Sequence, residues 1–206
     1  MIGIIDYGMG NLGSVSNACR FLGLPCSILS SPQEMDRCRA VILPGVGAFG
    51  DCMKNLAGHG FVEAVRQWVE AGRPFLGICL GLQLLYENSE ESPGVAGLGL
   101  EPGTVRRFAL PAEFKVPQIG WNRVWQAQPA CPLFAGLPDG AYFYFVHSYY
   151  AEASGAAGEA GRTRYGMDYT SVLWRDNVLA VQFHPEKSQQ LGLQMLRNFG
   201  RWVEAS

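Results

Sequence analysis

The sequence predicts an α/β protein with a central, mostly parallel sheet flanked by helices and with additional antiparallel strands in the second half of the chain. Over roughly the first 90 residues, short apolar runs alternate with amphipathic segments, which is typical of parallel βαβ units. Beyond about residue 93 the segments alternate or are rich in aromatics, as strands are. A chain of 206 residues without an internal repeat or a low-complexity linker favours a single domain over residues 1–206.

In the first half, four short apolar runs are candidates for buried strands. They cover residues 2–5, 26–29, 40–43 and 75–78. Helices are predicted over residues 12–21, which a glycine and a proline follow, and over residues 61–69, whose apolar side chains have helical spacing. Residues 31–34 resemble a further helix start, and residues 82–86 a buried helical segment.

The second half is expected to add antiparallel strands and a terminal helix. The candidate strands cover residues 104–108, 121–125, 141–146, 169–174 and 178–183. The last two are close enough to form a hairpin that turns at Asp176-Asn177. Residues 188–202 carry apolar side chains on one helical face, and residues 151–161, rich in Ala, Gly and Glu, predict an exposed loop or hairpin tip.

Cys79 stands where the fourth strand meets the segment that follows it. Gly77 and Gly81 lie two residues to either side, so the backbone can turn sharply from strand to helix around the cysteine. Such a turn exposes the sulfur at the carboxyl end of the strand, above a helix amino terminus that favours a thiolate. The pattern makes Cys79 a candidate nucleophile, and the alternative is a buried apolar cysteine, as most free cysteines are.

The tetrapeptide Pro44-Gly45-Val46-Gly47 ends the strand that precedes the Cys79 strand in the sequence. Parallel order would place this loop beside Cys79, at the sheet edge where open α/β sheets bind ligands. Its two glycines would leave backbone N–H groups free to face a developing oxyanion. An ordinary turn is the alternative interpretation of these four residues.

His184 and Glu186 come directly after the apolar run over residues 178–183. Two residues apart at the end of a strand, their side chains can share a face. An acidic residue can hold the imidazole tautomer while the other ring nitrogen takes a proton from a thiol. A strand-end histidine alone is more often structural, but together with the glycine-flanked Cys79 the pair indicates nucleophilic catalysis.

The composition narrows the class of function. With 48% hydrophobic and 17% charged residues the chain suits a compact protein, and a formal charge of −2 argues against nucleic acid or an anionic membrane as the main partner. The six cysteines include no C-x-x-C pair and only three histidines are present, so no metal site is predicted. Scattered cysteines, without a basic leader at the amino terminus, point to the cytoplasm.

One further motif could indicate a different function, the binding of a dinucleotide. Gly8-x-Gly10-x-x-Gly13 formally matches the dinucleotide-binding fingerprint after a first strand. That fingerprint also requires an acidic residue about 20 positions further on. The chain reads Leu29-Ser30-Ser31 there, so nucleotide binding is not expected.

The chain resembles the class I, or triad, glutamine amidotransferases in three motifs: residues 77–83 (GICLGLQ), 44–47 (PGVG) and 184–186 (HPE). A narrower resemblance, to the glutaminase subunits of imidazole glycerol phosphate synthase, rests on residues 6–12 (DYGMGNL), 120–122 (GWN), 145–149 (FVHSY) and 183–188 (FHPEKS). The resemblance runs from residue 2 to about residue 200. It implies a flavodoxin-like fold and the hydrolysis of glutamine to glutamate and ammonia for histidine biosynthesis.

This resemblance implies a role for each matched residue. Cys79 would attack the carboxamide of glutamine, His184 would move the protons, and Glu186 would orient His184. The oxyanion hole would be formed by the N–H of Leu80 and by one N–H from Gly45, Val46 or Gly47. Glutamine would be bound by Gly47, Gln83, Glu91, Ser148 and Tyr149. No cofactor is implied, because thioester chemistry is complete with protein groups.

The same resemblance implies a heterodimer with a (β/α)8-barrel cyclase subunit, contacted through Asn11, Trp121 and Lys187. The cyclase would use the ammonia to make imidazole glycerol phosphate and aminoimidazole carboxamide ribonucleotide. Two other interpretations stay open: a binding or regulatory subunit without turnover, and an independent cysteine hydrolase of the same fold, such as a γ-glutamyl peptidase. The intact triad favours turnover over the first, and only the partner-facing motifs argue against the second.

Overall fold

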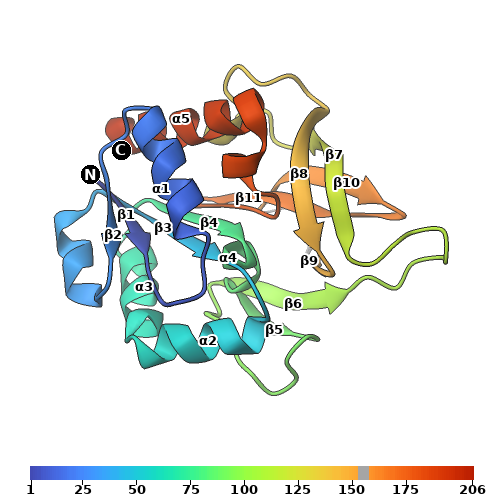
Figure 1. Cartoon of the computed structure of the whole chain (residues 1–206), viewed down its shortest axis with the longest axis horizontal. Helices are drawn as coiled ribbons and strands as arrows, with labels where there is room; N and C mark the ends of the chain where they lie inside the picture. Colours follow the sequence, from blue (N-terminus) through green and yellow to red (C-terminus); the bar gives the residue numbers. More distant parts are fainter. Residues whose placement is uncertain (153–157) are drawn as a thin grey trace.

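A sheet that is parallel on one side and antiparallel on the other runs through the computed structural model, which describes residues 1–152 and 158–206 (Figure 1). Its parallel half consists, in spatial order, of β2 (Cys26–Leu29), β1 (Ile2–Ile5), β3 (Ala40–Gly45), β4 (Phe75–Cys79) and β12 (Val178–Val181). The antiparallel half continues through β11 (Met167–Arg175), β10 (Glu159–Tyr165), β7 (Gln118–Gln126) and β8 (Ala141–His147). The predicted fold class is therefore confirmed.

Three shorter strands extend the sheet beside this main path. They are β5 (Tyr86–Ser89), β6 (Glu101–Arg107) and β9 (Tyr149–Ala151). Strand β5 pairs with β6 in parallel, whereas β6 and β11 each pair with β9 in antiparallel fashion. Through β9, the segment that follows β8 is tied to the middle of the sheet.

Helices cover both faces of the parallel half (Figure 1). One face is covered by α1 (Leu12–Phe21) and α5 (Gln189–Ala205), whose apolar side chains share a cluster with Ile4, Ile42 and Ile78. The other is covered by α2 (Phe49–Gly58) and α3 (Phe61–Glu70), which share a second cluster with Ile5 and Leu43. Because successive strand residues alternate between the two clusters, the parallel strands are apolar on both faces and read as continuous apolar runs.

The remaining helical segments are short. They are α4 (Leu80–Gln83) and the 3₁₀ helices Pro32–Arg37, Pro132–Phe134 and Pro185–Lys187. None of the helices within residues 1–152 and 158–206 is both long and apolar enough to span a bilayer.

Most predicted elements are present, and the differences have physical causes. The helix predicted over residues 82–86 is wrong, because α4 ends at Gln83 and the chain enters β5 at Tyr86. The strand predicted over residues 40–43 continues to Gly45, which pairs with Cys79. Helix α2 was not predicted, although its buried side chains have helical spacing.

The loop predicted over residues 151–161 is wrong at both ends. Ala151 is the last residue of β9, and Glu159 begins β10, where it pairs with Leu173 of β11. Residues 153–157 lie outside the described part of the chain.

Candidate active site

Cys79 ends β4 and sits at a strained turn directly before α4. Its backbone has φ 57° and ψ −111°, in the positive-φ region that side chains other than glycine rarely adopt. A Cβ on Gly77 would lie 2.7 Å from the carbonyl oxygen of Gly81, and a Cβ on Gly81 would lie 1.9 Å from that of Leu43. Both glycines are therefore required by backbone crowding, and the turn directs the sulfur toward the carboxyl edge of the sheet.

This crowding yields a prediction about stability. We expect Gly81→Ala to lower the free energy of unfolding by about 2 kcal/mol or more, because the added methyl group would overlap the fixed backbone of β3. Denaturant unfolding measures the difference. Gly58→Ala is the matched control: Gly58 is helical and exposed with nothing within 4 Å of an added Cβ, so its stability should change little or rise. Equal effects of both substitutions would contradict the prediction.

His184 reaches the same edge from β12, which lies beside β4 in parallel register. Its Nδ1 lies 2.9 Å from Oε1 of Glu186, and the side-chain amide of Asn11 donates to the same oxygen at 3.4 Å. The His184 side chain is only 3% exposed and that of Glu186 is fully buried. Burial lowers the pKa of His184, but hydrogen bonds with Cys79 and Glu186 outweigh it and raise the pKa to about 10. The contacts with Cys79 and Glu186 therefore favour the protonated form of the imidazole.

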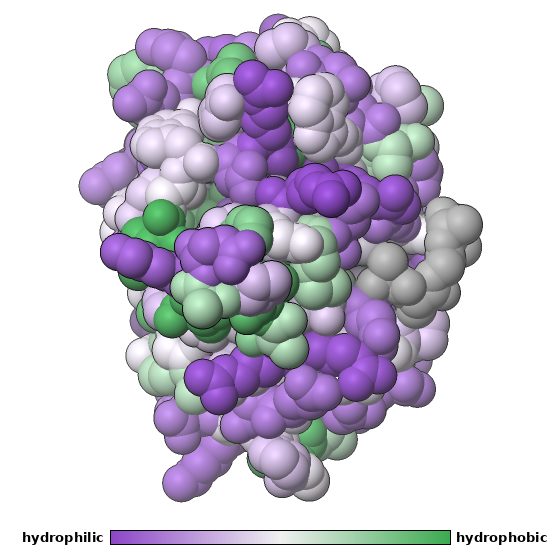
Figure 2. Space-filling view, turned by 90° about the vertical axis from the view of Figure 1, so that its right-hand side faces the viewer, coloured by the Kyte–Doolittle hydropathy of each residue, from purple (hydrophilic) through white to green (hydrophobic). Residues whose placement is uncertain are grey.

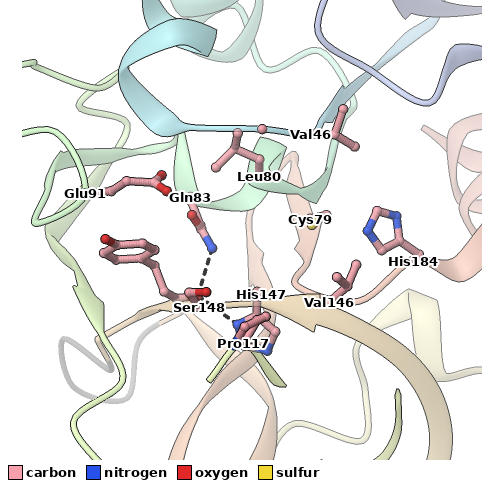
Figure 3. Close-up of a pocket in the computed structure, with 12 residues that line it drawn as sticks. Val46, Cys79, Leu80, Gln83, Glu91, Pro117, Val146, His147, Ser148 and His184 are labelled. Carbon is pink, nitrogen blue, oxygen red and sulfur yellow. Dashed lines mark hydrogen bonds between the residues drawn. The ribbon is translucent and has the colours of Figure 1, made fainter. Parts of the chain in front are cut away.

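Cys79 and His184 line a cavity of about 270 Å³ (Figure 3). Its wall contains Val46, Gly47, Cys79, Leu80, Gln83, Glu91, Pro117, Val146, His147, Ser148, Tyr149 and His184. All five residues predicted to bind glutamine lie in this wall, although they come from the loop after β3, from α4, from the loop after β5 and from the β8–β9 junction. Gly45 and Glu186 are not among the residues that line the cavity, but Glu186 contacts His184, which does.

Two polar side chains of the wall, Glu91 and Gln83, already make hydrogen bonds with other groups of the protein. The backbone N–H of Phe49, at the start of α2, donates to Oε2 of Glu91 at 2.7 Å. Nε2 of Gln83 donates to the Tyr149 carbonyl at 2.9 Å and to Oε1 of Gln182 at 3.0 Å. The Gln83 amide nitrogen is thus occupied by these protein acceptors, so its carbonyl oxygen is the atom available to a ligand.

The loop over residues 44–47 lies beside the turn at Cys79 as predicted, and its N–H groups are not equivalent. A Cβ on Gly45 would lie 2.9 Å from Cβ of Leu80, the first residue of α4. The N–H of Val46 donates to the carbonyl of Met9 at 3.3 Å. In this structure the Val46 N–H is therefore hydrogen-bonded to the Met9 carbonyl, whereas Gly47 lines the cavity.

Two buried residues at the site, Gln182 and His147, were not predicted from the sequence. Gln182 is fully buried, and its Nε2 lies 3.9 Å from Sγ of Cys79. His147 lies in the cavity wall with Nδ1 2.8 Å from the Tyr149 carbonyl and Nε2 3.2 Å from the Tyr169 hydroxyl. Burial lowers the pKa of His147 to about 4, so this ring is neutral at physiological pH. The available signals were the position of Gln182 two residues before His184 and that of His147 beside Ser148.

The three residues predicted at a partner interface lie outside the cavity. Asn11 precedes α1 and touches Glu186, Lys187 is exposed one residue after Glu186, and Trp121 on β7 is 46% exposed. Among the described residues, no group of three or more His, Cys, Asp and Glu side chains could hold a metal ion.

Comparisons with known proteins agree with this geometry. The family model described as glutamine amidotransferase class-I matches residues 3–202. The imidazole glycerol phosphate synthase subunit HisH of Desulfitobacterium hafniense (strain DSM 10664 / DCB-2) is 51% identical over 203 residues, covering 98% of this chain and 95% of that protein. The protein of the same name from Moorella thermoacetica is 52% identical over 202 residues, again covering 98% and 95%.

Solved structures show the same fold at lower identity. The chain superposes on a crystal structure of a glutamine amidotransferase with a TM-score of 0.77, at 20% identity and 98% coverage of both chains. A chain in the structure of PurLQS from Thermotoga maritima also gives a TM-score of 0.77, at 17% identity and 98% coverage of both. With a family model that spans nearly all of its length and relatives that share half of its residues, the chain belongs to the class-I glutamine amidotransferase family.

Proposed function

We propose that this chain is the glutaminase subunit of an imidazole glycerol phosphate synthase: it hydrolyses glutamine to glutamate and passes the ammonia to a synthase partner in histidine biosynthesis. The observation that carries the proposal is the alignment of Cys79, His184 and Glu186 at a cavity of about 270 Å³. The relatives that share half of the sequence over nearly its whole length are HisH subunits, which supports the choice of pathway.

The reaction follows from the roles of the triad. Because Nδ1 of His184 is held by Glu186, its Nε2 is the nitrogen left to exchange a proton with Cys79. The sulfur attacks the carboxamide carbon of glutamine and forms a tetrahedral oxyanion. Collapse of this intermediate breaks the C–N bond, and the ammonia leaves with a proton from His184, so that a thioester remains. Water, activated by His184, then hydrolyses the thioester to glutamate and frees Cys79.

The cavity wall supplies the binding groups. The oxyanion is stabilised by the N–H of Leu80, at the start of α4, and by one N–H of the loop at Gly45, Val46 or Gly47. Glu91 and the carbonyl oxygen of Gln83 are acceptors suited to the ammonium group of the substrate. Ser148, Tyr149 and Gly47 complete the contacts. No cofactor takes part, since each step uses only protein groups and water.

The partner is a (β/α)8-barrel cyclase, which uses the ammonia to make imidazole glycerol phosphate and aminoimidazole carboxamide ribonucleotide, and both subunits are cytoplasmic. Asn11, Trp121 and Lys187 form part of the contact. Figure 2 faces the β7–β8 side, where apolar side chains gather among hydrophilic ones. The exposed side chains of Ile119 and Trp121 on β7 suit a protein interface.

The test is glutaminase activity of the chain alone, with the cyclase, and with the cyclase plus its ribonucleotide substrate. We expect slow hydrolysis by the isolated chain and an increase of about a hundredfold in the loaded complex, the effect of gaining one oxyanion donor. A rotation of the Gly45–Val46 peptide, whose N–H now faces Met9, would supply that donor if the complex binds the rotated state more tightly.

Each rival function predicts a different result. Full activity of the isolated chain would favour an independent hydrolase. No glutaminase activity in any of the three mixtures, despite formation of the complex, would favour a regulatory subunit without turnover.

A further inference from the structure

Two buried side chains that take no part in the proposed reaction donate hydrogen bonds to carbonyl groups of the Pro44–Gly47 loop. The first is Tyr7, two residues after β1, whose hydroxyl donates to the carbonyl of Pro44 at 3.0 Å. Tyr7 is 1% exposed, and burial raises the pKa of its phenol, so the donated proton stays in place throughout the physiological range. Its hydroxyl also lies where a Cβ on Gly45 would come within 2.9 Å, so it is in close contact with the loop.

The second is Cys52, on the first turn of α2. Its thiol donates to the carbonyl of Val46 at 3.4 Å and lies 3.6 Å from the hydroxyl of Tyr7. Burial raises the pKa of the Cys52 thiol to about 11, so this sulfur also keeps its proton. Each side chain has one proton to donate. The Tyr7 hydroxyl has Cys52 Sγ as a second, more distant acceptor, and the carbonyl of Pro44 is the closer of the two. The two side chains thus contact different loop carbonyls.

The two held carbonyls determine where the neighbouring N–H groups point. In a trans peptide the C=O and N–H groups point in opposite directions. The carbonyl of Val46 points at Cys52, which does not line the cavity, so the N–H of Gly47 points away from Cys52, on the side where Gly47 lines the cavity. We propose that Tyr7 and Cys52 are positioning residues of the oxyanion loop, which fix the Pro44 and Val46 carbonyls and thereby present the N–H of Gly47 to the cavity.

This assignment separates the three loop N–H groups named as oxyanion candidates. The N–H of Val46 is bonded to Met9, and rotation of its peptide takes place between two carbonyls that Tyr7 and Cys52 hold. Gly47 then acts as a fixed donor, and the Gly45–Val46 peptide is the part of the loop left to move. The assignment rests on the proposed glutaminase function for its catalytic consequence, but the contacts that hold the loop can be tested without any activity.

The test uses Tyr7→Phe, which removes only the hydroxyl, and Cys52→Ala, which removes only the sulfur. Tyr86→Phe and Cys38→Ala are matched controls, because both residues are buried in the same apolar cluster as Tyr7 and Cys52 but lie away from the loop. In the isolated chain, hydrogen exchange of the peptide covering residues 44–49 should be about fivefold faster in each test variant, as expected for the loss of one hydrogen bond. The control variants should exchange like the wild type.

The kinetic measurement uses each variant in complex with the cyclase and its ribonucleotide substrate. The kcat for glutamine should fall about fivefold in both test variants while KM changes by less than about twofold, because an oxyanion donor acts in the transition state. Synthesis from added ammonia should be unchanged.

The outcomes separate the two proposals. Unchanged exchange of residues 44–49 in both test variants would overturn the holding role, whether or not the wild type is a glutaminase. Faster exchange with unchanged kcat would overturn the positioning role. Absence of glutaminase activity in the wild-type complex would refute the proposed function, and the exchange result would still decide whether these side chains hold the loop.

Discussion

Replacing Cys79 with alanine is expected to lower glutamine hydrolysis more than about a hundredfold while the fold and the complex with the partner persist. The sulfur forms the only covalent bond to the substrate in the proposed reaction, and loss of a triad nucleophile typically costs far more than a hundredfold in rate. The strained backbone at φ 57° is a feature that an inert buried cysteine would not require. Steady-state glutaminase assays of the complex measure the loss.

Two controls make this result specific. Synthesis by the complex from added ammonia should continue in Cys79→Ala, because external ammonia bypasses the glutamine site. Cys131→Ala should keep full glutaminase activity, since Cys131 is buried under α5 and burial raises its pKa to about 12. A Cys79→Ala variant that retained more than about one hundredth of the wild-type rate would refute the nucleophile assignment.

His184→Ala is expected to reduce the rates of thioester formation and thioester hydrolysis by about a hundredfold or more, because the imidazole moves a proton in both steps. Glu186→Gln should cause a smaller loss: an amide oxygen in the place of Oε1 can still accept the Nδ1 proton and hold the ring. Single-turnover assays on folded variants separate the two steps.

The exposed His59 provides the control for His184. Its Nδ1 lies 2.8 Å from the carbonyl of Asn55 in α2, the helix that it follows, and it does not line the cavity, so His59→Ala should leave the glutaminase rate unchanged. Equal losses in His184→Ala and Glu186→Gln would contradict the division of roles between a residue that moves protons and one that orients it.

The parts of the site that depend on local sequence could be predicted. Gly77 and Gly81 allowed the turn at Cys79 to be predicted, because backbone atoms leave no room for a Cβ at either position. The apolar runs predicted the parallel order that places the 44–47 loop beside Cys79. The strand that leads to His184 was expected among the antiparallel strands, and it was not foreseen that β12 also pairs with β4 in parallel. The assignments of individual binding residues remain predictions, and the structure adds that their predicted side chains meet at one cavity.

Other parts of the site depend on contacts between distant segments. Gln182 meets Gln83 across 99 positions of sequence, and Tyr7 meets Cys52 across 45. Such pairs leave no periodicity or spacing signal, because each side chain alone resembles an ordinary core residue. The helix at α4 was predicted to extend too far for a related reason. Its buried leucines suit a helix, but the helix ends at Gln83, and Tyr86 pairs with Glu101 of β6.

The position of β12 between β4 and β11 has a consequence for synthesis of the chain on the ribosome. Strand β12 is formed by residues 178–181, so until they emerge the edge of β4 has no neighbour on that side, and His184 is absent. In the proposed reaction, a nascent chain that already contains Cys79 therefore lacks the base that activates the thiol and should not hydrolyse glutamine. It also exposes the edge of an apolar strand, which makes the unfinished chain prone to aggregation until β12 pairs with β4.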